Sequence, residues 1–263
     1  MPPRVVSLVP SVTETLLAWG VTPVACTRFC EQPDLPHVGG TKDPDVAAIV
    51  DLEPDLVVMC VEENRREDAD ALAEAGVVTA AVSIDAVDDV APALRMLAAL
   101  TGADHPAADL DALEALRDTA ASGRAGTDRA AGEAPRRAFV PIWKRPWMTL
   151  SGATYGSSLL ATIGVENVFA DATTRYPTVT LDEVRARRPD VVLAPSEPYP
   201  FAERHVPLFA DVAPVVLVDG QDLFWWGVRT PAAAGRLRAQ LAELRSSTAT
   251  RPPPGGRATP PDR

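Results

Sequence analysis

Three short segments of this sequence combine aromatic side chains with charged ones, and each follows a run that predicts a β-strand. The segments are residues 143–147, 195–201 and 225–229. Flat aromatic side chains offer a large contact area at low cost in conformational entropy. Paired tryptophans also occur in protein cores, but clustering beside three cations favours a ligand site. The candidate residues are Trp143, Lys144, Arg145, Trp147, Glu197, Tyr199, Phe201, Trp225, Trp226 and Arg229.

A fourth candidate segment, Glu62 to Arg65, lies at the end of an earlier strand and the start of a helix. Acidic residues are favoured in the first turn of a helix by the helix dipole, which accounts for Glu62 and Glu63 without a ligand. We nevertheless include Glu63 and Asn64 among the candidate ligand-binding residues.

The sequence carries no catalytic signature. It lacks a glycine-rich dinucleotide or phosphate loop, a His-Glu-x-x-His motif and a Gly-x-Ser-x-Gly elbow. Its three histidines are far apart, and Cys26, Cys30 and Cys60 have no metal-ligand spacing. We therefore expect no enzyme, no intrinsic cofactor and no metal site. The cysteines are expected to be reduced and buried.

The elements that would position these segments alternate between strand and helix, which indicates an α/β fold with parallel sheets. Ligands of such folds gather at the carboxyl ends of the strands. Ser11 to Glu14 and Thr180 to Glu183 each match a helix capping box. The predicted strands are 5–9, one around 24, 56–60, 77–82, 138–142, 191–194 and 215–218. The predicted helices are 11–19, 45–52, 64–75, 88–100, 157–163 and 231–244.

The order of elements in the second half repeats that of the first, which predicts two similar lobes. We expect an N-terminal α/β lobe over 4–103 and a C-terminal α/β lobe over 136–245. Between them, 104–135 is expected to form a connecting helix, with Leu110, Leu113 and Leu116 on one apolar face. Residues 246–263 are rich in Pro, Ser and Thr and are expected to be a disordered tail.

Net charge and hydropathy limit the classes of partner and the cellular location that the sequence predicts. The net charge of −11 argues against a nucleic-acid surface. No run is long enough for a membrane span, and the segment Met1 to Val9 does not match a signal peptide or a lipid-anchor motif. The sequence as written therefore predicts a cytoplasmic protein, or an extracytoplasmic one if the start codon is misassigned. We expect a monomer.

Several segments, taken in order, resemble the substrate-binding proteins of ATP-binding-cassette importers for cobalamin, haem and iron siderophores, the helical-backbone metal receptors. The resemblance covers about 4–245 and is nearest to the cobalamin-binding branch. The segments that carry it are 4–14, 38–42, 52–57, 62–65, 142–148, 196–201 and 219–229. The resemblance implies two Rossmann-like lobes joined by a helix, with the ligand in the cleft between them.

This resemblance implies reversible capture of a corrinoid, a small-molecule metal chelate, for a permease of the ATP-binding-cassette class. Trp143, Trp147, Tyr199, Trp225 and Trp226 would pack on the ligand, while Lys144, Arg145, Asp222 and Arg229 would meet its amides and phosphate. Cys30 is the cysteine considered as an axial ligand to the metal of the chelate. Three alternatives stay open. The cations would suit an anionic siderophore or haem. The chain could also be a cytoplasmic corrinoid carrier or sensor, or an enzyme on a similar fold.

Overall fold

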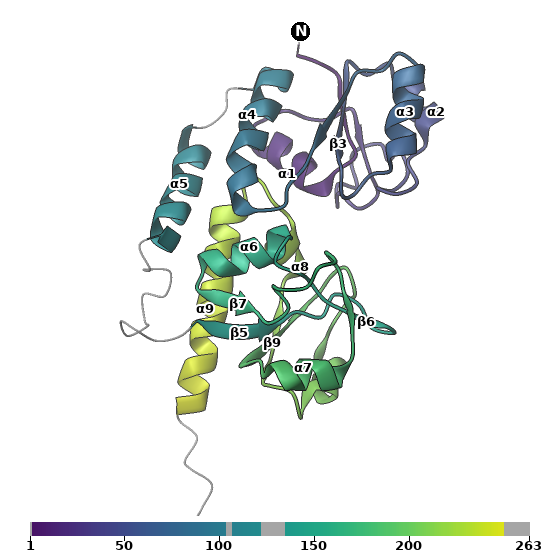
Figure 1. The fold of residues 1–263 in the computed structure, drawn as a ribbon. Coiled ribbons are helices and arrows are strands. Elements are labelled where there is room, and N and C mark those ends of the chain that lie inside the picture. Colours follow the sequence, from purple (N-terminus) through teal and green to yellow (C-terminus); the bar gives the residue numbers. More distant parts are fainter. Residues whose placement is uncertain (1, 104–106, 122–134, 250–263) are drawn as a thin grey trace, which may run out of the picture.

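The computed structural model describes residues 2–103, 107–121 and 135–249. In this part of the chain, two four-stranded parallel sheets form the centres of two lobes, stacked one above the other in Figure 1. Helices cover the sheets, so the predicted α/β class with two parallel-sheet lobes is confirmed.

The first lobe has the strand order β2-β1-β3-β4, and all its strand pairs are parallel. Its strands are β1 (Val5–Ser7), β2 (Ala25–Cys26), β3 (Leu56–Cys60) and β4 (Thr79–Val82). Its helices are α1 (Pro10–Ala18), α2 (Val46–Asp51), α3 (Arg66–Glu74), the 3-10 helix η1 (Val87–Asp89) and α4 (Val90–Thr101). Every residue of β3 is buried, as expected for a central strand covered by helices on both faces.

The second lobe has the strand order β10-β9-β5-β7, again parallel. Its strands are β5 (Arg136–Phe139), β7 (Val165–Asn167), β9 (Val191–Pro195) and β10 (Val215–Val218), with a separate antiparallel pair of β6 (Trp147–Met148) and β8 (Thr178–Val179). Its helices are α6 (Tyr155–Thr162), α7 (Leu181–Arg187), η2 (Glu203–Phe209), α8 (Gly220–Phe224) and α9 (Thr230–Ala249).

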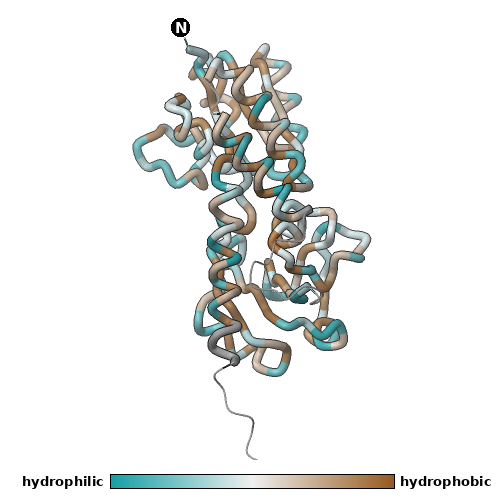
Figure 2. The backbone as a smooth tube through the Cα atoms, turned by 90° about the vertical axis from the view of Figure 1, so that its left-hand side faces the viewer, coloured by the Kyte–Doolittle hydropathy of each residue, from teal (hydrophilic) through white to brown (hydrophobic). Residues whose placement is uncertain are grey.

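Helix α5 (Ala107–Ala121) lies between the lobes in sequence and contacts both. It packs on α6 and α9 of the second lobe. Trp19 of the first lobe donates its Nε1–H to Asp109 at 2.9 Å. Figure 2, which faces the α5 side of Figure 1, shows helices running lengthwise past the junction of the lobes. The remainder of the predicted connecting segment, 104–106 and 122–134, lies outside the described residues.

One hydrophobic core runs through both lobes instead of stopping at their boundary. Val5 and Leu16 of the first lobe, Leu113 of α5, and Leu159 and Leu237 of the second lobe belong to the same buried cluster. Two smaller clusters fill the outer faces of the sheets. The lobes are therefore held together by apolar packing as well as by the chain.

The structure corrects two local predictions. Ser11 does not cap the first helix, because Pro10 already occupies its first turn and Val9 is the N-cap without a side-chain bond. Proline suits that position, where its missing N–H has no partner to lose. Helix α9 continues to Ala249, so 246–249 are helical and not part of a disordered tail. The capping box of Thr180 and Glu183 is confirmed.

Candidate functional site

Each sheet has a switch point, where the order in which the chain adds strands reverses. The candidate segments follow the strands at these points. In the first lobe, β2 lies on one side of β1, and the chain then crosses over to place β3 on the other side. In the second lobe, β7 lies on one side of β5, and the chain then crosses over to place β9 on the other side. Crevices for ligands form at the carboxyl ends of strands at such switch points. Residues 61–65 follow β3, 140–147 follow β5 and 196–201 follow β9. The structure thus brings these three segments to the expected edges, whereas 225–229 follows helix α8 and not a strand.

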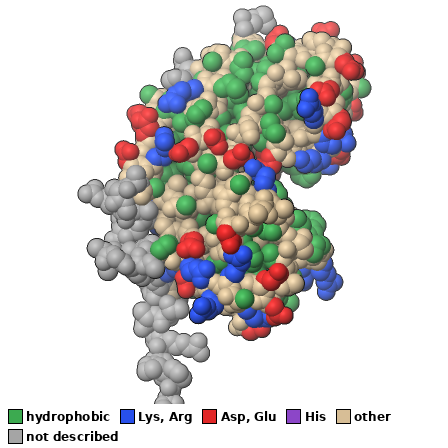
Figure 3. Space-filling model, viewed as in Figure 1, with side chains coloured by type: hydrophobic (Ala, Val, Ile, Leu, Met, Phe, Trp, Pro, Cys, Tyr) green, Lys and Arg blue, Asp and Glu red, His purple; other side chains and the backbone are tan. Residues whose placement is uncertain are grey.

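The carboxyl ends of the two sheets face each other, because residues that follow strands of one lobe interact with those of the other. Arg175, between β7 and β8, pairs with Glu62 at 2.9 Å and with Asp85 at 2.6 Å. The charge of Glu197 in the second lobe also contributes to the raised pKa of Glu63 in the first. In Figure 3 the surface is indented between the lobes, on the side away from α5. We call this indentation the interlobe cleft. Arg175 is not among the residues predicted for the site, because nothing nearby in sequence marks it.

Four of the predicted aromatic residues form one connected group in the second lobe. The ring of Trp143 meets that of Tyr199 edge-on, with centroids 5.7 Å apart. Tyr199 contacts Phe201 at 4.7 Å, and Phe201 is stacked with Trp147 at 6.2 Å. Exposure falls along the group: Trp143 is 44% exposed, whereas Phe201 is 5% exposed. Trp143 and the half-buried Tyr199 are therefore the members best placed to meet a ligand, and Phe201 supports them.

The adjacent tryptophans after β10 differ in their surroundings. Trp225 is half-buried, donates its Nε1–H to Glu197 at 2.8 Å and carries the Arg229 guanidinium 5.2 Å from its ring centre. Trp226 is 3% exposed and belongs to the core shared by the lobes. Its Nε1 is buried without a hydrogen-bond partner among the described residues. Of the pair, Trp225 is the one that borders the cleft group, and Trp226 lies in the core.

The cations predicted for the site are not equivalent. Arg229 is engaged inside the protein, with both oxygens of Glu14 at 2.7 and 2.9 Å and with Asp222 at 3.3 Å. Asp222 is buried and also accepts from Arg236 at 2.5 and 2.6 Å. Glu14 comes from the first lobe, so this network joins the lobes. Arg145 is exposed and Lys144 half-buried, which leaves these two as the predicted cations near Trp143.

Asn64 and Glu63, the predicted pair after β3, also differ. The buried Asn64 amide bonds the main chain of Cys60 at 2.7 Å, Thr41 at 2.9 Å and Leu8 at 3.3 Å, so it holds three segments together. Glu63 is half-buried, and no hydrogen bond or ion pair of its carboxyl is found in the described part of the chain. Burial, and then the neighbouring Glu62, raise the pKa of Glu63 to about 7. Perturbed carboxyls of this kind are typical of functional sites.

Of the six large apolar side chains that remain exposed among the described residues, four lie on connections that follow strands, whereas Val78 precedes β4 and Leu100 lies in α4. Phe29 follows β2, Val61 follows β3, Trp143 follows β5 and Tyr176 precedes β8, and they are 50%, 65%, 44% and 37% exposed. Exposed apolar side chains gathered at one place indicate an interaction site. The sequence alone did not reveal Phe29, Val61 or Tyr176, because isolated apolar residues next to strands look like core positions.

Cys30 lies close to this region but is 2% exposed. Its sulfur accepts from the Thr13 hydroxyl at 3.2 Å and lies 3.2 Å from the Thr27 hydroxyl. Hydrogen bonding to Cys26, together with these hydroxyls, lowers the pKa of Cys30. All three cysteines are free and buried, as expected. Among the described residues, no group of three or more His, Cys, Asp or Glu side chains has the arrangement of a metal site.

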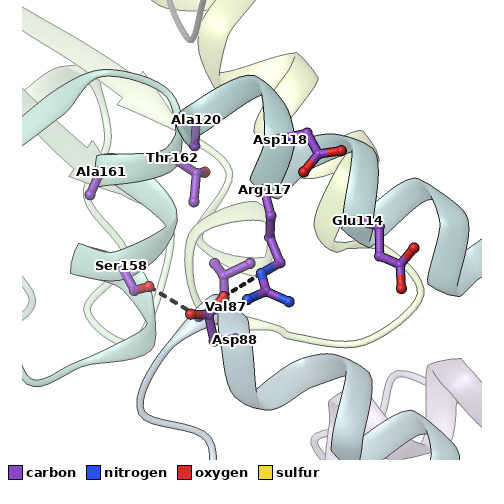
Figure 4. A pocket seen from close by; sticks show the side chains of 9 residues that line it. All are labelled: Val87, Asp88, Glu114, Arg117, Asp118, Ala120, Ser158, Ala161 and Thr162. Carbon is purple, nitrogen blue, oxygen red and sulfur yellow. Dashed lines mark hydrogen bonds and ion pairs between the residues drawn. The ribbon is translucent and has the colours of Figure 1, made fainter. Parts of the chain in front are cut away.

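A cavity of about 650 Å³ lies elsewhere, where η1, α5 and α6 meet. Figure 4 shows Arg117 of α5 paired with Asp88, and Ser158 of α6 bonded to the main chain of Val87. The lining is charged or small and contains none of the predicted aromatic residues. This cavity therefore belongs to the junction of α5 with both lobes and not to the interlobe cleft. No helix in the described ranges is both long and apolar enough to cross a membrane.

Comparison of the sequence with known proteins identifies a family of binding proteins. A family model described as "Periplasmic binding protein" matches residues 5–201. The vitamin B12-binding protein of Salmonella choleraesuis is 30% identical over 195 residues, which cover 73% of this chain and 71% of that protein.

Solved structures with the same fold cover nearly the whole chain. The periplasmic vitamin B12 binding protein BtuF of Vibrio cholerae has a TM-score of 0.73 and 20% identity, covering 93% of this chain and 98% of its own. The periplasmic heme binding protein HutB of the same organism has a TM-score of 0.74 and 21% identity, covering 91% and 98%. At these identities the structural likeness establishes the fold alone.

Proposed function

This chain belongs to the periplasmic binding protein family, and we propose that it captures a corrinoid in the interlobe cleft and passes it to a permease of the ATP-binding-cassette class. The family is one of binding proteins, and we infer capture without turnover. The curated relative that supports the corrinoid is named for vitamin B12 binding.

The observation that carries the proposal is that exposed aromatic and apolar side chains lie on connections of both lobes, on the side where Arg175 joins the lobes through Glu62 and Asp85. Phe29 and Val61 extend from the first lobe, and Trp143 and Tyr176 from the second. A large flat macrocycle exposes apolar faces that such side chains cover well. Trp143, Tyr199 and Trp225 are the aromatic contacts we propose, with Lys144 and Arg145 beside them. Phe201, Trp147 and Trp226 would position these contacts from behind.

We propose an extracytoplasmic location, which was the alternative to the predicted cytoplasmic one. The family supports it, whereas the cytoplasmic prediction finds no support in these comparisons. A monomer remains our expectation, because each copy supplies both walls of the cleft. Fractionation of cells that express the full-length gene tests the location. Recovery of the protein in the cytosol alone would contradict it.

Binding tests the proposed ligand directly. Cobalamin and cobinamide are titrated into the purified protein, with tryptophan fluorescence and heat as the signals. We expect one-to-one binding with quenching, because Trp143 and Trp225 would lie against the ring. Haemin is the second candidate, since a heme binding protein shares the fold. Tight binding of haemin or a ferric siderophore, with none of either corrinoid, would contradict the proposal.

A further inference from the structure

Three glutamates lie on strand-end connections of the two lobes that border the interlobe cleft. Glu62 and Glu63 follow β3, and Glu197 follows β9 in the other lobe. The negative charge of Glu197 contributes to the raised pKa of Glu63, and that of Glu31 contributes to the raised pKa of Glu197. Burial, followed by nearby acidic groups, raises the pKa of Glu197 above its ordinary value. The cation that acts on Glu63 from its own lobe is Lys42, whose Nζ is bonded to the main-chain oxygen of Glu62 at 2.6 Å.

Two of these carboxyls offer hydrogen-bond acceptors that the protein leaves unused. Oε2 of Glu62 accepts from Arg175 at 2.9 Å, but its Oε1 is buried and has no partner within the described residues. The carboxyl of Glu63 likewise has no hydrogen bond or ion pair in the described part of the chain. Glu197 differs, because its Oε1 already accepts the Trp225 Nε1–H at 2.8 Å. Glu62 and Glu63 are therefore the side chains with free acceptor oxygens.

A buried acceptor without a donor is destabilising, and a ligand that supplies the donor removes that cost. Primary amides on the edge of a corrin ring are neutral and carry N–H donors. Propionates on a porphyrin edge carry negative charge and, when ionised, no donor. Placed beside Glu62 and Glu63, an amide would gain hydrogen bonds, whereas a carboxylate would meet like charge.

We propose that Glu62 and Glu63 make the cleft selective for macrocycles whose edge carries primary amides, and against those whose edge carries carboxylates. This inference depends on the proposed function, since it assumes that a macrocycle enters the interlobe cleft. In this proposal both Glu62 and Glu63 accept hydrogen bonds from the amides of the ligand, and both repel carboxylates. The neighbouring aromatic side chains would supply contact area for either kind of ring, so the discrimination comes from the carboxyls.

The test uses two corrinoids with the same ring: cobinamide, and the same corrin with its peripheral amides hydrolysed to carboxylic acids. Dissociation constants for both are measured at pH 8, where more of Glu63 is ionised. We expect wild-type protein to bind the amide form at least about tenfold tighter, equivalent to 1.4 kcal/mol. Glu62→Gln/Glu63→Gln should bring the ratio toward one, because glutamine can donate to a carboxylate.

Two further variants separate selectivity from general damage. Glu63→Gln alone keeps the ion pair between Glu62 and Arg175, so a reduced ratio in this variant excludes loss of that pair as the cause. Glu74→Gln changes an exposed glutamate at the end of α3 and should leave the ratio unchanged. Equal binding of the two corrinoids by the wild type, or an unchanged ratio in the double variant, would overturn the inference alone. Binding of haemin with no binding of either corrinoid would overturn the proposed function as well.

Discussion

Trp225 and Trp226 are neighbours in the chain, but one substitution at each should have opposite effects on binding and stability. Trp226 is 3% exposed in the shared core, so Trp226→Ala should lower the free energy of unfolding by about 3–5 kcal/mol. Trp225 is half-buried beside Glu197. Trp225→Ala should weaken corrinoid binding by about 2 kcal/mol, as for aromatic anchors in interfaces, and change stability much less. Denaturant melts run beside ligand titrations distinguish the two.

The opposite pattern would change the roles assigned to Trp225 and Trp226. If Trp225→Ala lowered the unfolding midpoint sharply and left affinity per folded molecule intact, Trp225 would be a packing residue. Trp226→Phe provides a matched control, since it keeps most of the apolar volume and removes an Nε1–H that has no partner among the described residues. It should cost far less stability than Trp226→Ala.

Glu63 should make stability depend on pH. Its pKa in the folded protein is about 7, against 4.5 as the ordinary value. Between these pH values the folded state binds more protons than the unfolded state, so stability falls as pH rises through this window. Glu63→Gln removes the titration. Because the side chain is half-buried and partly screened, we expect the variant to be about 1 kcal/mol more stable than wild type at pH 8, and similar at pH 4. Melting curves across this range test it, and equal pH profiles would contradict it.

The candidate residues could be predicted from sequence, but their pairing could not. Aromatic residues after strands were visible as a pattern, and the fold brought them to the expected edge. Arg229, in contrast, was predicted to meet the ligand, while the structure pairs it with Glu14, which lies 215 residues away in the chain. Nothing in a local pattern encodes such a contact. The same reason explains why Arg175, which joins Glu62 and Asp85, was missed.

At the scale of elements, the turn between α8 and α9 is fitted closely against α1. Gly227 has a φ of +115°, and a Cβ there would clash with Oγ1 of Thr15 in the other lobe. Its main-chain N–H donates to Thr230 at 3.1 Å. Gly227→Ala should therefore destabilise the protein, by about 1–3 kcal/mol for the backbone strain alone. Thermal or denaturant unfolding measures the loss.

Gly235 is the matched control for Gly227. It lies within α9, and a Cβ there would meet nothing within 4 Å. Gly235→Ala should stabilise the protein by up to about 1 kcal/mol, because alanine favours a helix over glycine by that amount. A loss of stability in Gly227→Ala together with a gain in Gly235→Ala would support the packing argument. A neutral Gly227→Ala would show that the turn can move away from α1.

The longer elements follow from sequence, and the short ones do not. The runs Leu56–Cys60 and Val215–Val218 were predicted with the bounds observed, because short continuous apolar stretches rich in valine indicate strands. The β6 and β8 pair was missed, since each strand has two residues and no periodicity can be read from so few. Helix α8 was also missed, because its five residues are fixed by a cap from Asp219 and by packing on α6 and α9.

At the scale of the molecule, the two lobes are joined by more than their connecting chain. Helix α5 is tied to the first lobe by Arg117 with Asp88 at 2.6 Å and Glu114 with Arg95 at 3.9 Å. It packs on α6 and α9 of the second. A continuous apolar core and the Arg229–Glu14 pair add to these ties. Large hinge rotations would have to break these contacts together, so the cleft is largely formed before the ligand arrives.

We therefore expect little closure on binding. Small-angle scattering of the protein with and without cobinamide should give radii of gyration that agree within experimental error. Arg175→Ala identifies what sets the lobe separation, because it removes the ion pairs to Glu62 and Asp85 and leaves α5 and the core untouched. If α5 and the core hold the lobes, the free variant should have the wild-type radius. If the ligand-free variant had a larger radius of gyration that returned to the wild-type value on binding, the Arg175 ion pairs would instead be what holds the cleft closed. A large decrease on binding in the wild type would mean that α5 does not act as a rigid strut.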